Sequence, residues 1–96
     1  MIKIKFAAIK FYNLDTNCWQ IITAKNHALC VTKMYEKNIK YDKSTYKQGF
    51  VTSQGNTHFV SRTTAGYIAW KAGQIKEIPQ NPKMWYLYSQ NVDWSV

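Results

Sequence analysis

The chain has 96 residues, of which 46% are hydrophobic and 16% aromatic, a balance typical of a globular protein. We expect one α+β domain over residues 1–96, long enough to bury a modest core. No apolar run approaches the roughly 20 residues of a membrane-spanning helix. The N-terminus alternates apolar and basic residues where a signal peptide has an apolar stretch. The sequence therefore predicts a soluble intracellular protein.

Positive charge dominates, because 13 basic residues face 5 acidic ones and give a formal net charge of +8. Such a charge attracts nucleic acid, membrane phosphates or an acidic protein surface. Twelve of the 13 basic residues are lysine, in a chain also rich in Asn, Tyr and Ile, and an AT-rich coding sequence produces this mixture without selection for anion binding. Arg62 is the single arginine, and its planar fork makes it the better phosphate ligand.

The first third of the chain predicts a β-hairpin followed by a helix. Residues 2–12 have an extended pattern, residues 13–17 form a turn, and residues 18–22 return as the second strand. Thr23 or Asn26 then caps a helix of about eleven residues. One face of this helix carries His27, Cys30, Val31 and Met34.

Residues 38–47 are polar and lack clear periodicity, so they predict a surface loop. Their lysines and the tyrosines Tyr41 and Tyr46 are compatible with base stacking, although a solvated surface is the simpler interpretation.

The stretch over residues 48–75 predicts a second hairpin that runs into a capped helix. Its strands are residues 50–53 and 58–60, and the Gly and Asn of residues 54–57 suit a tight turn. Ser61 is the expected N-cap of a helix over residues 62–72. The apolar stripe of that helix is Ala65, Ile68, Ala69 and Ala72, and Gly73 occupies the position of a left-handed C-cap.

The C-terminal part predicts a proline-containing loop at residues 79–82, a strand at residues 84–89, and Trp94 tucked against the sheet. The fold class is therefore α+β, an antiparallel sheet of two hairpins plus a C-terminal strand, with two helices packed on one face.

Several runs in this sequence resemble a family of small, mostly uncharacterised phage-encoded proteins. They are QGFVTS from residue 48, FVSR from residue 59, AGQI from residue 72 and LYSQNVDW from residue 87. In that family the hairpin–helix junction reads FVDREEA and the tail reads LYSEDLW. Here Ser61 stands in place of the Asp, Thr63 and Thr64 in place of the Glu pair, and Gln90-Asn91 in place of Glu-Asp. The resemblance implies a protein of the host cytoplasm.

Residues suited to catalysis or metal binding are few. Cys18 and Cys30 are expected as reduced thiols, and together with His27 and His58 they match no common zinc-site spacing. The five carboxylates are scattered, and the glycines form no nucleotide-binding loop. We therefore expect no enzymatic activity, no metal and no cofactor.

Binding is the remaining chemistry, and its centre is expected at Arg62, where a helix N-terminus favours an anion. Two hydroxyls follow it, and His27 opens the other helix. The candidate ligand-binding residues are Arg62, His27, Thr63, Thr64, Lys25 and Gln74. A structural interpretation stays open for both centres: Arg62 pairs with a carbonyl or a carboxylate, and His27 is a half-buried histidine bonded to the backbone.

Tyr67 and Trp70 lie off the apolar stripe of their helix, so they predict an interface and a homo-oligomer. Two functions stay open. A counter-defence protein of the phage would sequester a phosphate-bearing nucleotide immune signal, as anti-Thoeris and anti-CBASS sponge proteins do. An anti-CRISPR-like inhibitor would occlude a host effector through aromatics such as Tyr41, Tyr46 or Trp70. A small basic nucleic-acid-binding protein is the third alternative.

Overall fold

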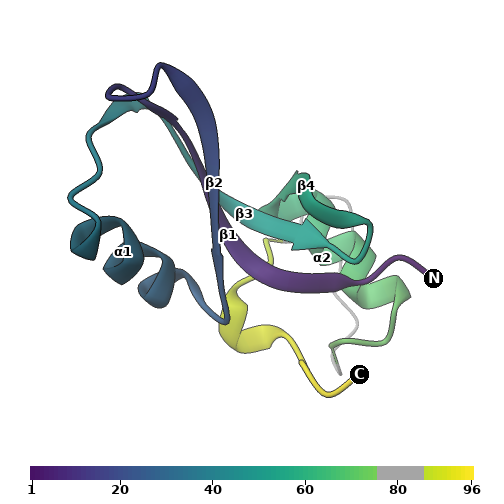
Figure 1. Cartoon of the computed structure of the whole chain (residues 1–96). Helices are drawn as coiled ribbons and strands as arrows, with labels where there is room; N and C mark the ends of the chain where they lie inside the picture. Colours follow the sequence, from purple (N-terminus) through teal and green to yellow (C-terminus); the bar gives the residue numbers. More distant parts are fainter. Residues whose placement is uncertain (76–85) are drawn as a thin grey trace.

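The computed structural model describes residues 1–75 and 86–96. The elements in chain order are β1 (Ile4–Asn13), β2 (Cys18–Ala24), α1 (His27–Glu36), β3 (Tyr41–Thr52), β4 (Gly55–Ser61), α2 (Arg62–Lys71) and the short 3-10 helix η1 (Ser89–Asn91). The strands form one curled antiparallel sheet in the order β2-β1-β3-β4 (Figure 1). The predicted α+β class is confirmed.

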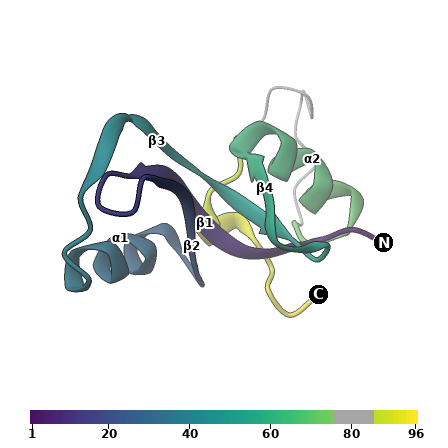
Figure 2. The same ribbon diagram turned by 45° about the horizontal axis from the view of Figure 1, so that its top comes forward.

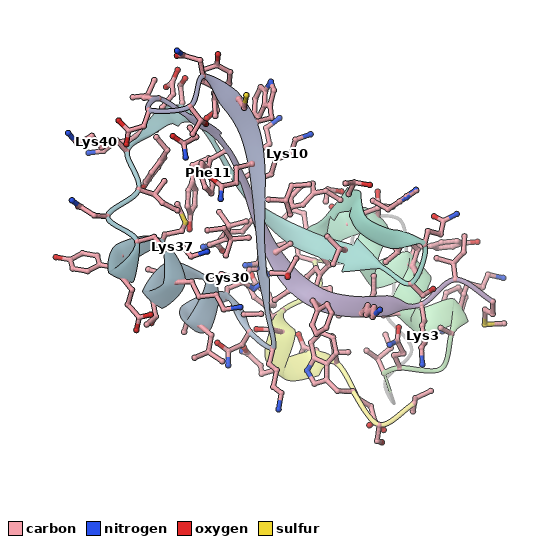
Figure 3. The ribbon with its side chains drawn as sticks, viewed as in Figure 1. Lys3, Lys10, Phe11, Cys30, Lys37 and Lys40 are labelled. Atoms are coloured by element: carbon pink, nitrogen blue, oxygen red, sulfur yellow. The ribbon has the colours of Figure 1, made fainter. Side chains whose placement is uncertain are left out.

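Alternation along β1 separates the two faces of the sheet. Ala7, Ile9 and Phe11 are fully buried on the face that packs against the helices. Figure 3 shows Phe11 directed towards α1 and Lys10 directed to the other side of the sheet. Both helices contribute to the same cluster, whose members include Cys30 and Met34 of α1, Ala65 and Ala69 of α2, and Phe50, Leu87 and Val92. This shared core fixes the starts of the two helices relative to each other.

Helix α1 begins at an asparagine cap. The side-chain oxygen of Asn26 accepts a hydrogen bond of 2.8 Å from the Leu29 amide, so the predicted cap at Asn26 is confirmed. One turn further on, Cys30 is fully buried and its thiol lies 3.6 Å from the Ala7 carbonyl oxygen on β1. These contacts hold the first turn of α1, including His27, against the centre of the sheet.

The second hairpin turns earlier than expected. Thr52 pairs with Gly55, so residues 53 and 54 make the turn, and Gly55 has a φ of 145°. Ser61 caps α2 as predicted, because its hydroxyl accepts a hydrogen bond from the Thr64 amide. Gly73 has a φ of 72° just beyond the helix, which confirms the left-handed C-cap.

The loop predicted over residues 38–47 is wrong from Tyr41 onward, where β3 begins. β3 pairs with β1 on both sides of an irregularity, where the register shifts between Lys10↔Lys47 and Tyr12↔Asp42. Over this step β1 advances by two residues and β3 by five. The extra residues break the period-two pattern of β3, and they allow Tyr41 and Tyr46 to reach the core together.

The strand predicted over residues 84–89 is also wrong in its described part. Residues 86–88 belong to no strand or helix, and Ser89 begins η1. Residues 84 and 85 and the predicted loop at 79–82 lie outside the described residues. The C-terminal segment, defined as residues 86–96, lies between α1 and α2 (Figures 1 and 2). It buries Leu87 and Val92, whereas Trp94 stays 39% exposed.

Candidate functional site

Arg62, the first residue of α2, connects the sheet, α1 and the C-terminal segment. Its Nη1 donates a hydrogen bond of 2.7 Å to the Leu87 carbonyl oxygen, and its Nη2 donates one of 2.5 Å to Oε1 of Gln48. The guanidinium carbon lies 5.0 Å from the ring centroid of Tyr88, within cation–π range. The expected pairing of Arg62 with a carbonyl is thereby confirmed. Among the described residues no carboxylate neutralises it, and three of its five N–H donors are engaged, counting a contact with His27.

His27, the first residue of α1, meets Arg62 through its ring. Its Nε2 lies 2.7 Å from the Gly49 carbonyl oxygen, so Nε2 carries the proton and donates it. The other nitrogen, Nδ1, is then an acceptor and lies 3.5 Å from Nη2 of Arg62. Burial lowers the pKa of His27 below its usual 6.5, and the charge of Arg62 lowers it further. The imidazole is therefore neutral at physiological pH, as a buried histidine bonded to the backbone.

A hollow of about 570 Å³ opens beside these two residues, between the start of α1 and the C-terminal segment. Its wall is formed by Lys25, Asn26, His27, Ala28, Arg62, Tyr88, Ser89, Gln90 and Trp94. Lys25 and Arg62 are cationic, and no acidic residue belongs to this described wall. The amide groups of residues 27 and 28 are in the first turn of α1, where N–H groups have no intrahelical acceptor. The described wall is therefore positively charged and includes the aromatic rings of Tyr88 and Trp94.

The structure brings together three of the six candidate ligand-binding residues, namely Arg62, His27 and Lys25. Thr63 and Thr64 do not belong to the hollow. The amide and hydroxyl of Thr64 both contact the Ser61 side chain, so this residue completes the cap of α2. The structure therefore does not form the expected cradle of Arg62 with its two threonines, because Arg62 faces α1 instead.

Gln74 lies in the core and not in the hollow. Its side-chain oxygen accepts a hydrogen bond from the Ile4 amide, and its side-chain nitrogen donates to the Ile4 carbonyl, both at 2.8 Å. With 1% of its surface exposed, the amide group is fully used within the protein. The ligand-binding role expected for Gln74 is thus corrected to a structural one, which ties the end of α2 to the start of β1.

Most of the wall residues that sequence reasoning missed come from the C-terminal segment, and the other two, Asn26 and Ala28, flank His27. Tyr88, Ser89, Gln90 and Trp94 all lie in the run LYSQNVDW, which resembles the tail of a phage protein family. The resemblance of that run was the one sequence feature that could have identified these residues. The predicted strand over residues 84–89 gave no reason to place them beside His27. Its position follows from the pairing of Leu87 with Arg62.

The aromatic residues expected at interfaces have different environments. Tyr67 is 42% exposed and lies edge-on to the half-buried Trp70, with ring centroids 5.9 Å apart. The Lys71 ammonium lies within 5.8 Å of both rings. By contrast, Tyr41 and Tyr46 are half-buried and pack on the core, so they are not the exposed aromatics expected for a docking surface. The homo-oligomer stays a prediction.

Within residues 1–75 and 86–96, no three His, Cys, Asp or Glu side chains gather into a possible metal site. Both cysteines are free thiols, Cys18 exposed and Cys30 buried. The helices of these ranges are too short and too polar to cross a membrane.

Comparison with known proteins identifies a family for almost the whole chain. The model of the family described as Phage T4 y16D protein matches residues 3–93. The match therefore includes both hairpins, both helices and most of the C-terminal segment. Neither the curated proteins nor the solved structures give a match to this chain.

Proposed function

The chain belongs to the phage T4 y16D protein family, and from this premise we propose that it is a counter-defence protein. In this proposal it binds and sequesters a phosphate-bearing nucleotide signal of the host immune system without catalysis. The observation that carries the proposal is the hollow in which Lys25, Arg62 and the start of α1 converge.

The wall of the hollow offers separate contacts for the two parts of a nucleotide. A phosphate is attracted by the Lys25 ammonium, by the first-turn amides of α1 and by the two N–H donors that Arg62 keeps available. The exposed faces of Tyr88 and Trp94 are suited to a base or ribose. A volume of about 570 Å³ lies within the usual range for small-molecule sites.

Sequestration is favoured over turnover because the one histidine of the wall is already engaged. Gly49 and Arg62 occupy its two ring nitrogens, which leaves no free general base there. The described wall also contains no carboxylate and no cysteine. A ligand held in this hollow would leave it unchanged.

Occlusion of a host effector by protein–protein contact is the second candidate function. One observation favours it: Tyr35 of α1 is 87% exposed and is flanked in sequence by Lys33 and Lys37. Tyrosine is enriched at protein interfaces and is among the residues that most often dominate their binding energy. In this alternative the hollow would have no ligand.

Binding is tested by native mass spectrometry and calorimetry with cyclic dinucleotides and cyclic ADP-ribose isomers. Lys25 is exposed and makes no side-chain hydrogen bond to another described residue. Lys25→Ala should therefore weaken nucleotide binding about tenfold or more without changing the melting temperature. Lys43→Ala is the matched control, because it removes the same charge at a distant position. Lys43 is exposed and lies near the opposite end of the β1–β2 hairpin.

The recovered nucleotide should have an unchanged mass, since no step consumes it. A chemically altered ligand would contradict sequestration. If no nucleotide binds the wild-type protein, or if both lysine variants lose affinity equally, the hollow is not the site and the occlusion hypothesis takes precedence.

A further inference from the structure

Two lysines face each other on the side of the sheet away from the helices. Lys10 of β1 and Lys47 of β3 are direct cross-strand partners, so their side chains project to the same face. Like charges at such positions destabilise a sheet. Neither ammonium forms an ion pair with a carboxylate of the described chain, and Lys47 is exposed. The repulsion between the two lysines therefore costs stability, and no interaction within the described sheet compensates for it. A negatively charged partner would remove this cost.

Aromatic rings surround the Lys10 ammonium. It lies 5.3 Å from the ring centroid of Trp19 and 5.9 Å from that of Phe59. Tyr12 stands edge-on to Trp19 with centroids 5.6 Å apart, as its cross-strand partner. Trp19 is 56% exposed, an unusual position for the largest apolar side chain. The neighbouring ring thus fixes Trp19 in place and leaves much of its surface open.

Gly49 of β3 allows the Phe59 ring to lie close to the backbone of the sheet. A Cβ added at Gly49 would stand 2.6 Å from the Phe59 ring, so only glycine permits the ring to cover β3 there. Ala8, the cross-strand partner of Gly49, is fully buried and also has a small side chain. We call Lys10, Tyr12, Trp19, Lys47 and Phe59 the sheet-face platform.

The platform has little negative charge around it. β1, β2 and β4 contain no Asp or Glu. The one acidic residue of β3, Asp42, accepts hydrogen bonds from the amide and hydroxyl of Ser44. The total number of lysines gives no specificity in so lysine-rich a chain. The distinctive feature is that the Lys10 ammonium lies beside the exposed indole of Trp19, with Lys47 as its cross-strand partner and no carboxylate of the described residues paired with either lysine.

We propose that the sheet-face platform binds single-stranded nucleic acid. Unpaired bases stack on the open face of Trp19, while Lys10 and Lys47 neutralise the adjoining phosphates. A duplex keeps its bases stacked inside, so it offers only the phosphates. This site is independent of the nucleotide hollow, because α1 and the C-terminal segment lie on the other side of the sheet (Figure 3).

The test is fluorescence anisotropy with a labelled oligothymidylate of about 15 nucleotides, a length that spans a typical single-strand site. The double variant Lys10→Gln/Lys47→Gln should lose at least about tenfold in affinity and reduce the salt slope by about 1.4, or about 0.7 for each lysine. Its melting temperature should stay equal or rise, because the repulsion between the two ammoniums is removed.

The control Lys37→Gln/Lys40→Gln removes the same charge from two exposed positions, one directly after α1 and one directly before β3, and Figure 3 labels both residues. It should retain most of the affinity. Trp19→Ala should weaken binding about tenfold, and Trp19→Phe should restore most of the loss, because a ring remains for stacking.

Equal losses in the two lysine double variants would show general electrostatic attraction and overturn the proposal. Duplex binding as tight as single-strand binding, or full affinity in Trp19→Ala, would overturn it as well, as would binding of an acidic protein but no oligonucleotide. Lys25→Ala should keep its affinity for the oligonucleotide, so failure of the nucleotide hollow and failure of the platform are distinguishable.

Discussion

Arg62 and Leu87 hydrogen-bond each other in both directions. The Leu87 amide donates to the Arg62 carbonyl at 3.2 Å, and Nη1 of Arg62 donates to the Leu87 carbonyl at 2.7 Å. Leu87 is fully buried, and the residues after it form one wall of the hollow. Arg62 therefore anchors the C-terminal segment that forms the opposite wall of the hollow. The same side chain thus has a structural role and a proposed role in binding.

Arg62→Ala should lower the free energy of unfolding by about 2–4 kcal/mol, because it leaves two partly buried acceptors, the Leu87 carbonyl and the Gln48 side-chain oxygen, without their donor. Arg62→Lys should recover only part of this, since an ammonium cannot replace the fork. Urea unfolding measures the loss, and hydrogen exchange at the Leu87 amide reports release of the segment. Unchanged stability in Arg62→Ala would contradict the structural role.

Gln74→Ala should cost about 3 kcal/mol, because the amide and the carbonyl of Ile4 would both be left unsatisfied in the core. The matched control is Gln90→Ala, in which an exposed glutamine is removed and the change should be less than about 0.5 kcal/mol. Denaturant unfolding of the two variants decides the point. Similar midpoints would show that Ile4 is satisfied in another way.

The stability of the protein should fall as the pH drops below about 6.5. The pKa of His27 is lowered in the folded state by burial and by Arg62, so below 6.5 the unfolded chain takes up a proton that the folded chain does not. Well above 6.5 the histidine is neutral in both states, so its protonation no longer affects the stability. Melting temperatures measured between about pH 5 and 8 test this prediction.

His27→Gln should flatten this pH dependence, whatever its effect on the melting temperature itself. The exposed His58 remains in both proteins and serves as an internal reference. If the slope below pH 6.5 is the same with and without His27, the protonation of His27 is not linked to folding.

The parts of the fold that the sequence predicted are those governed by local chemistry. Asn26 and Ser61 cap their helices because their side chains reach the N–H group three residues further on, and Gly73 ends α2 because few other residues adopt a positive φ. Each of these preferences lies within one turn of chain. Hairpin strands with period-two alternation, such as β1, were predictable for the same reason.

The errors arose where distant contacts decide the structure. β3 reads as a loop because three extra residues opposite Lys10 and Tyr12 break its alternation. Residues 86–88 have strand-forming side chains, but Leu87 pairs with Arg62 at a helix start instead of a strand. The hollow combines segments more than 60 residues apart in sequence, Lys25 with Tyr88, so residue patterns identified only Arg62, His27 and Lys25.

Gly73→Val should cost on the order of 1–2 kcal/mol through backbone strain alone. The φ of Gly73 is 72°, a conformation that L side chains disfavour, whereas an added Cβ would meet no atom within 4 Å. Gly73→Ala should cost nearly as much, because both changes carry the same strain. Chemical denaturation of the two variants should therefore give similar midpoints, and a much larger loss for valine would point to a steric clash.

Gly49→Ala should be more damaging than either change at Gly73, although it adds one methyl group. The new Cβ would lie 2.2 Å from the Val60 carbonyl oxygen and 2.6 Å from the Phe59 ring, so the β3–β4 pairing itself must shift. We expect a loss of about 3 kcal/mol, at the upper end of what overpacking costs. The double variant Gly49→Ala/Phe59→Ala should recover little of it, because the contact with Val60 is to backbone and removal of the ring relieves only the second clash. Full recovery in the double variant would show that the Phe59 ring alone requires glycine at this position.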